Sequence, residues 1–209
     1  MDASPRPAMF AAFGEWAPRG KFLMEALIVL AVIAAVVFYG IVLYNGLVKH
    51  RQMVGEGWSG IDVQLKRRAD LIPNLLESVK GYMKHEKSLL EEVTKLRANA
   101  QAAANATPEA RAKIEGALSG ALGRLMAIAE SYPDLKANQN FLDFQKALQD
   151  TENELSMSRR YYNGATRNNN VAVESFPGNL IAGRFGFSKA EFFEIDDQAD
   201  RAVPKVSFN

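Results

Sequence analysis

The chain has 209 residues, with 25 lysines and arginines against 24 aspartates and glutamates, and a formal net charge of +1. A balance this even gives no global attraction to nucleic acid, so no nucleic-acid partner is predicted. Cysteine is absent and only His50 and His85 are present. That composition excludes disulfides, thiolate metal sites and a cysteine nucleophile, and it argues against a multi-histidine metal site. No metal or other cofactor is therefore predicted.

The N-terminal part contains one long apolar run. Residues 1–21 include three prolines and Trp16 and are interpreted as a short tail. Residues 26–43 (ALIVLAVIAAVVFYGIVL) carry no charge or strongly polar group, and at about 1.5 Å per residue they cross most of a hydrocarbon core about 30 Å thick. A cleaved signal peptide would have a shorter apolar region ending at a small-x-small site. A buried core helix is a second alternative. We interpret residues 22–43 as an uncleaved transmembrane helix.

The bases around this run bear on orientation. Three precede it (Arg6, Arg19 and Lys21), whereas five follow it (Lys49, Arg51 and residues 66–68). Close to the span the counts almost cancel, but the five that follow favour a cytoplasmic C-terminal domain.

A strongly helical pattern follows the span. Apolar residues recur in two registers with alternating spacings of three and four, which places them on one helical stripe: Trp58, Leu65, Ile72, Val79 and Val93 in one register, and Ile61, Leu75, Tyr82, Leu89 and Leu96 in the other. Pro73 lacks a backbone donor and predicts a kink or break around residues 69–73, and Gly81 is a second weak point. The stretch from Leu47 to about Ala100 is therefore either one rod on the order of 80 Å long or two helices.

Later segments predict further helices and no strands. Thr107, Pro108 and Glu109 form a good helix start, with threonine as N-cap and proline at the first helical position. That helix closes at residues 131–133. Another runs from about residue 135 or 140 to about 173, and Phe176-Pro177-Gly178 ends it. Residues 188–193 offer a last turn. Four aromatic side chains near the C-terminus are expected to dock on the bundle: Phe185, Phe187, Phe192 and Phe193.

The basic triplet Lys66-Arg67-Arg68 has two interpretations. It can attract anionic lipid headgroups, at about 1 kcal/mol per base near the surface. However, a straight helix places it about 30 Å beyond the span, which is several Debye lengths, and Asp62 and Asp70 lie within reach. Ion pairing within the bundle or on its surface is therefore favoured over lipid recognition.

No catalytic motif is found. His85-Glu86 resembles the start of a zinc-binding H-E-x-x-H helix, but residue 89 is Leu, so the second ligand is missing. Glu152 and Glu154 are two residues apart and cannot share a helix face. There are no repeated E-x-x-H motifs for a di-iron centre, and no phosphate loop or nucleophile elbow. An enzyme is the weakest of the alternatives.

Several segments resemble the LemA family of bacterial membrane proteins. The resemblance covers about residues 42–208 and is carried by Tyr44-Asn45, Leu47-Val48, Arg51, WSGIDVQLKRRADLIPNLLESVKGYMKHE (58–86), Arg97, residues 159–163 (RRYYN), Ser175-Phe176-Pro177, Phe185-Gly186-Phe187 and residues 190–193 (AEFF). It implies a single-pass protein of the bacterial inner membrane, with the N-terminus outside and a four-helix bundle in the cytoplasm. It implies no established enzyme activity and supplies no ligand residues, although some members are associated with the formation of specialised membrane compartments.

The sequence thus predicts an all-α fold, in which an N-terminal transmembrane helix precedes an antiparallel four-helix bundle. The bundle domain is expected over residues 44–193 and a C-terminal tail over 194–209. Recurring polar positions suggest a buried or half-buried network that fixes helix register, formed by Asp62, Arg68, Asp70, Asn74, Glu152, Arg159 and Asn163.

The predicted function is a membrane-anchored helical scaffold or protein-interaction module. Its expected partners are the lipid bilayer, other membrane proteins and a second copy in a homo-oligomer. A sensor or adaptor bundle that passes a signal across the membrane has the same architecture, but a 21-residue outer tail is too small for a ligand domain.

Overall fold

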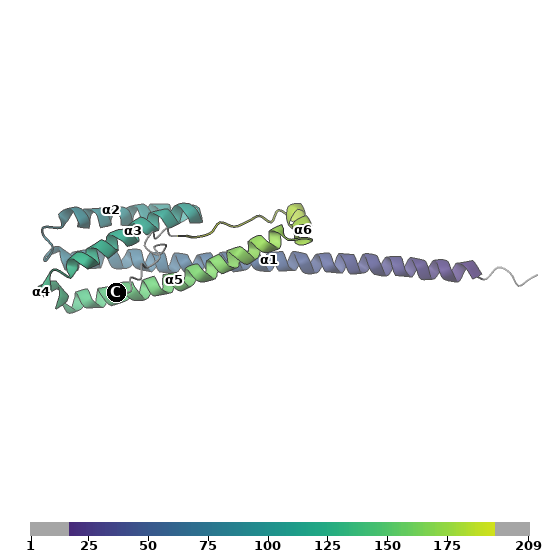
Figure 1. The fold of residues 1–209 in the computed structure, drawn as a ribbon, viewed down its shortest axis with the longest axis horizontal. Coiled ribbons are helices and arrows are strands. Elements are labelled where there is room, and N and C mark those ends of the chain that lie inside the picture. Colours follow the sequence, from purple (N-terminus) through teal and green to yellow (C-terminus); the bar gives the residue numbers. More distant parts are fainter. Residues whose placement is uncertain (1–16, 195–209) are drawn as a thin grey trace, which may run out of the picture. The chain divides into compact units, whose positions relative to one another are not determined.

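The computed structural model describes residues 17–194, with side chains from residue 21 onward. Over this range the fold is all-helical and contains no strand (Figure 1). Its elements, in chain order, are α1 (Ala17–Lys80), α2 (Lys87–Ala102), the short 3₁₀ helix η1 (Ala103–Asn105), α3 (Pro108–Ala129), α4 (Pro133–Lys136), α5 (Gln139–Glu174) and α6 (Gly178–Phe185). The all-α fold class is confirmed.

The chain divides into two compact units, Met1–Gly46 and Leu47–Asn209. The predicted start of the bundle domain at residue 44 lies three positions before this division. Of the two predicted tails, residues 1–16, including Trp16, and residues 195–209 lie outside the described part of the chain.

The described part of the first unit is the N-terminal portion of α1. It contains an 18-residue window that is long and apolar enough to cross a membrane, and none of that window is buried. Leu27, Val36 and Phe38 are each more than half exposed. Apolar side chains that a unit leaves entirely uncovered are typical of a helix surrounded by lipid.

In the second unit, α1 continues through Pro73 and ends at Lys80. Of the kink or break expected around residues 69–73, the break is wrong, and so is the alternative of one rod reaching residue 100, whereas a break at Gly81 is confirmed. The structure gives the reason. Pro73 cannot donate to the carbonyl of Ala69 four residues earlier, and the Nε of Arg97 in α2 donates to that carbonyl instead, at 2.7 Å. The helix passes the proline because a neighbouring helix supplies the missing donor.

The starts of α3 and α5 are set by side-chain caps. The hydroxyl of Thr107 accepts from the backbone N–H of Ala110 at 3.4 Å, with Pro108 at the first helical position. The side chain of Asn138 accepts from the N–H of Phe141 at 3.3 Å. Each cap satisfies one of the four backbone donors that a helix start leaves without a partner. The predicted start of α3 at Thr107 is confirmed.

The main hydrophobic core draws side chains from α1, α2, α3, α4 and α5. The predicted stripe residues Ile72, Leu75 and Val79 of α1 are fully buried in it. They meet Val93 of α2 and Leu125 of α3, which are also fully buried. A second cluster surrounds Ile61, Leu65 and Leu155, and a third joins Leu47, Ala182 and Phe187.

The C-terminal segment differs from the prediction. Helix α6 ends at Phe185 and is capped by Gly186, whose φ of 73° is the left-handed conformation that glycine adopts without strain. Residues 187–194, which we call the C-terminal strap, then run back beside α5 in non-helical form, so the expected turn at 188–193 is wrong (Figure 1). Phe187 and Phe193 dock as expected, whereas Phe185 and Phe192 are 59% and 37% exposed.

Candidate functional site

A buried guanidinium links three helices at the centre of the second unit. Arg68 of α1 is 0% exposed. It forms ion pairs with Glu115 of α3 and, at 2.6 Å, with Glu152 of α5, and it donates to the hydroxyl of Ser119 at 2.6 Å. The side chain of Glu115 is 3% exposed. Charged side chains buried this deeply need oppositely charged partners. Arg68 and Glu115 are partners of this kind, and their ion pair is also a hydrogen bond.

Arg111 of α3 extends the same cluster. It pairs with Asp62 of α1 at 2.8 Å and lies 3.8 Å from the second carboxylate oxygen of Glu115. It also donates to the carbonyl of Ala104 at 3.1 Å, and its guanidinium lies 5.7 Å from the ring centre of Trp58. We call Asp62, Arg68, Arg111, Glu115 and Glu152 the ion network. Its two cations and three anions connect α1, α3 and α5.

A second polar arrangement on α5 holds the C-terminal strap. The amide of Asn170 donates to the carbonyl of Ala190 at 3.0 Å and accepts from its N–H at 2.8 Å. Asn163, seven residues earlier, does the same with Phe193, at 3.1 and 3.0 Å. Asn169 donates to the carbonyl of Ser188 at 3.2 Å. The paired amides satisfy donors and acceptors of the strap that would otherwise lack partners in the interior.

An aromatic cluster lies between the strap and α1. The ring of Trp58 is 5.5 Å from that of Tyr162 and 5.7 Å from that of Phe193, in tilted and edge-to-face geometry. The hydroxyl of Tyr162 donates to the carbonyl of Glu191 at 2.7 Å. Burial raises the pKa of Tyr162 above its ordinary value of 10.0, because the low-dielectric surroundings disfavour the phenolate. The neutral form that burial favours is the one that donates the hydrogen bond to Glu191.

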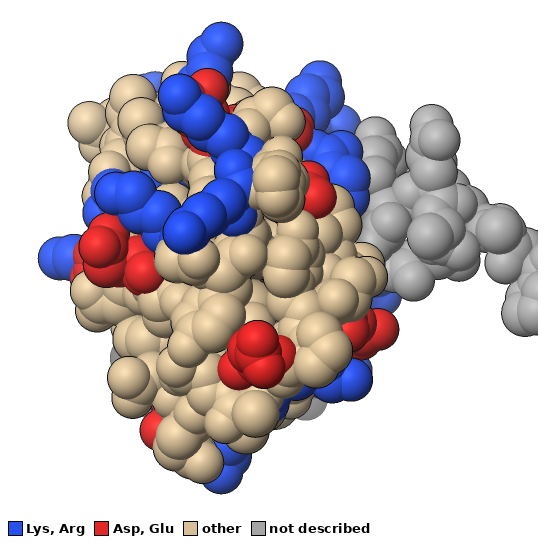
Figure 2. Space-filling view, turned by 90° about the vertical axis from the view of Figure 1, so that its left-hand side faces the viewer, with Lys and Arg blue, Asp and Glu red and all other residues tan. Residues whose placement is uncertain are grey.

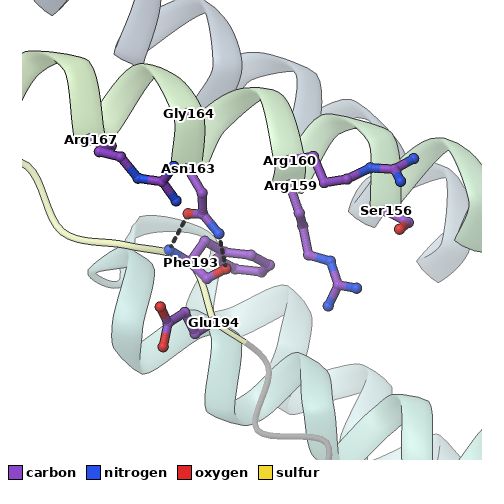
Figure 3. A pocket seen from close by; sticks show the side chains of 8 residues that line it. All are labelled: Ser156, Arg159, Arg160, Asn163, Gly164, Arg167, Phe193 and Glu194. Atoms are coloured by element: carbon purple, nitrogen blue, oxygen red, sulfur yellow. Dashed lines mark hydrogen bonds between the residues drawn. The ribbon is translucent and has the colours of Figure 1, made fainter. Parts of the chain in front are cut away.

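A shallow pocket of 470 Å³ lies between α5 and the end of the C-terminal strap. Figure 3 shows the side chains of Arg159 and Arg160 projecting from one turn of α5 and that of Arg167 from a later turn. The side chain of Asn163 points at the backbone of Phe193. Glu194 lies on the opposite wall. The pocket therefore combines three bases with one acid and is open to solvent.

The residues predicted from sequence are divided among these sites. Asp62, Arg68 and Glu152 are brought together in the ion network. Asn163 holds the strap and Arg159 lines the pocket on α5. Asp70 and Asn74 are exposed and form no ion pair or side-chain hydrogen bond within the described residues. Lys66 and Arg67, the neighbours of Arg68, are exposed.

Arg111, Glu115, Asn169 and Asn170 were not predicted, although the sequence contains a signal for three of them. Arg111 and Glu115 precede Leu118, Leu122 and Leu125 with the alternating spacing of a core stripe. Asn169 continues the buried series Phe141, Leu148, Leu155 and Tyr162 at intervals of seven. A polar side chain in a core register predicts a buried polar contact.

The polar side chains of the ion network and of the strap contact are bonded to one another or to the backbone. No group of three or more histidine, aspartate or glutamate side chains that could hold a metal ion occurs among residues 17–194.

Figure 2 shows the end of the second unit that carries α4 and the turn between α1 and α2, where lysine and arginine side chains gather over the upper half and acids are scattered. Three exposed lysines belong to this turn or flank it: Lys80, Lys84 and Lys87.

The described chain combines an apolar helix long enough to span a membrane with an all-helical unit whose helices are joined by buried ion pairs. These features define a membrane-associated helical protein. The chain belongs to the LemA family, whose sequence model matches residues 57–208. It is similar to magnetosome protein MamQ 2 of Paramagnetospirillum magneticum, with 25% identity over 88% of this chain and 77% of the relative. It is also similar to magnetosome protein MamQ of Magnetospirillum gryphiswaldense, with 24% identity over 90% and 80%. A third relative is protein LemA of Metamycoplasma hominis, with 25% identity over 73% and 69%.

Proposed function

We propose that this protein is a membrane-anchored helical scaffold or protein-interaction module of the bacterial envelope, without catalytic activity. One observation carries the proposal: the charged side chains of the ion network form ion pairs with one another. Arg68, at 0% exposure, is held by α3 and α5 at once. A group engaged in this way fixes the arrangement of helices and presents no reactive atom to a substrate.

The anchor places this rigid unit at a membrane. We propose a single-pass topology in the inner membrane, with the N-terminus outside and residues 47–209 in the cytoplasm, in keeping with the five bases after the span. Protease added to intact spheroplasts should leave the second unit intact, and it should be digested only after the membrane is permeabilised. Digestion from outside would overturn this orientation.

The expected partners are other membrane proteins and further copies of this chain. Because the chain has no cysteine, single cysteines can carry a photo-crosslinker without background labelling. Met157 and Tyr161 are exposed and lie four residues apart on one surface of α5, and Glu77 is exposed at the end of α1. Crosslinking in native membranes should give discrete products at some of these positions and not at others. If none of them gives a discrete product, the scaffold proposal is refuted.

The sensor or adaptor alternative is favoured by one observation, the arginine-lined pocket on α5. Three guanidinium groups around 470 Å³ suit a small anion. Inorganic pyrophosphate should then raise the melting temperature of the wild-type chain, and the double substitution Arg160→Gln and Arg167→Gln should abolish the increase. An equal response of both proteins, or no response, rules this candidate out.

A further inference from the structure

Helix α6 is held in one orientation by close packing. Its Ala182 is buried in a cluster with Leu47 and Phe187. A Cβ on Gly178 would lie 2.6 Å from the carbonyl oxygen of Ala172 in α5, so the two backbones approach more closely than any side chain would allow. The N–H of Phe187 donates to the carbonyl of Ala182 at 3.0 Å, which fixes the helix end. These contacts determine which face of α6 is packed and which side chains face outward.

Those outward side chains are large and apolar. Phe176, just before α6, is 79% exposed and Leu180 is 64% exposed, and these are the highest values for large apolar side chains within residues 47–194. Phe185 at the end of α6 is 59% exposed. We call these three residues the α6 apolar surface. Single exposed apolar residues need no explanation, whereas three large ones within ten residues of chain make this segment a candidate interaction surface.

Two exposed bases, Arg51 and Arg184, accompany this surface. Arg184 lies in the last turn of α6 and is exposed. Arg51 of α1 is exposed, and its guanidinium lies 5.0 Å from the ring centre of Phe187, next to the end of α6. The acid nearest in sequence to Phe176, Glu174, is paired with Lys189 at 2.7 Å. Exposed aromatic and leucine side chains accompanied by exposed bases are the composition of helices that lie in the headgroup region of anionic membranes.

Chain connectivity limits the distance between the apolar run and the cluster that holds Ala182 of α6. Leu47, which packs in one cluster with Ala182 of α6, follows Leu43, the last residue of the apolar run, by four positions. Four residues span about 6 Å as a helix and at most about 14 Å fully extended. The headgroup layer adds roughly 5–7 Å to each side of the hydrocarbon core. This distance limit holds for any conformation of the connecting residues.

We propose that the α6 apolar surface is a second membrane contact, which inserts Phe176, Leu180 and Phe185 into the headgroup region of the bilayer that holds the apolar run, with Arg184 among anionic headgroups. This proposal rests on the anchor in the proposed function. The apolar surface and its bases account for the choice of lipid, rather than a second copy of the chain, as the occupant.

The experiment uses the full chain in vesicles of phosphatidylethanolamine and phosphatidylglycerol. Single cysteines introduced by Phe176→Cys and Leu180→Cys carry an environment-sensitive fluorophore, and lipids carry a quencher either near the headgroups or deep in the acyl chains. The matched control is Leu142→Cys, an exposed leucine of α5 (41%) at the start of that helix. Val36→Cys reports on the anchor itself. Melting followed by Trp58 fluorescence checks that each variant keeps the wild-type fold.

The fluorophores at 176 and 180 should be quenched several-fold more strongly by the headgroup quencher than the one at 142. Emission typical of water at both positions would overturn the proposal. So would a protected environment insensitive to lipid quenchers, since protein would then cover the surface. Quenching at Val36 by the deep quencher, without quenching at 176 or 180, would refute only the second contact. Absence of quenching at Val36 would instead refute the anchor and with it the proposed function.

Discussion

Replacing Arg68 with alanine tests the ion network most directly. The substitution removes four hydrogen bonds, to Ser119, Glu152 and Glu115. It leaves Glu115, with a side chain only 3% exposed, beside Arg111 at 3.8 Å as its remaining charged neighbour in the network. Glu152, at 40% exposure, can be solvated by water. Breaking a buried ion pair on one side costs about 3–5 kcal/mol, mainly because the remaining charge stays buried.

For a unit of roughly 150–250 residues, each kcal/mol lowers the melting temperature by about 2–4 °C, so Arg68→Ala should lower it by roughly 6–20 °C. Asp70→Ala, two residues further along α1, is the matched control. Asp70 is exposed and makes no ion pair within the described chain, so its removal should change the free energy of unfolding by no more than about 0.5 kcal/mol.

The assay is thermal unfolding of the full chain in detergent, followed by the fluorescence of Trp58 in a Trp16→Phe background. Trp58 packs on Tyr162 and Phe193 and lies 5.7 Å from Arg111, so it reports on the network and on the strap. The double variant Arg68→Met and Glu115→Leu removes two of the three buried charges, leaves Arg111 paired with Asp62 at 2.8 Å, and should recover much of the lost stability. Equal melting of Arg68→Ala and Asp70→Ala would refute the reasoning.

Three further predictions concern other contacts of the second unit. Gly57→Ala places a Cβ 2.9 Å from the Cα of Tyr162 and should lower the free energy of unfolding in urea by about 1–3 kcal/mol. Gly55→Ala is the control: a Cβ there has nothing within 4 Å, so this substitution should be neutral or stabilising. Equal effects of the two substitutions would contradict the close approach of Gly57 to Tyr162. Asn170→Ala removes both hydrogen bonds to Ala190 and should speed amide exchange there roughly tenfold or more, with exposed Asn168→Ala as the control that should leave it unchanged. Because the pKa of Tyr162 is raised in the folded state above its ordinary value of 10.0, its stabilising contribution is complete below pH 10.0 and is lost as pH rises through the folded pKa. Stability should therefore fall less steeply above that pH in Tyr162→Phe than in the wild-type chain, and identical slopes would show that Tyr162 does not contribute.

The sequence predicted the helices well because their signals are local. The cap at Thr107, the stripe through Ile72 and Val79, and the glycine at 81 each act within a few residues. The continuation of α1 through Pro73 was not predictable in this way, since its donor, Arg97, comes from another helix. The strap was missed for the same reason: its hydrogen-bond partners are asparagines some 20–30 residues earlier in the chain.

The candidate polar residues were predicted less well than the helices. Arg68 and Glu152 both belong to the ion network, but Asp70 and Asn74, close to Arg68 in sequence, face solvent. Alternating spacing identifies a core stripe, and charged residues within it, such as Glu115, are the informative ones. A charge next to such a stripe says little, because one residue along a helix turns the side chain by about a quarter of the circumference.

The attachment of Arg68 to both α3 and α5 also limits how the second unit can move. A slide of one helix past another by one turn would shift it by about 5.4 Å and would separate a buried guanidinium from its carboxylates. Such a step would strand charge in the interior, at a cost that few binding events can offset. The unit is thus unsuited to piston-like transmission along its helix axes. A force on one helix, or a ligand that binds to it, would instead move all three helices together as a rigid body.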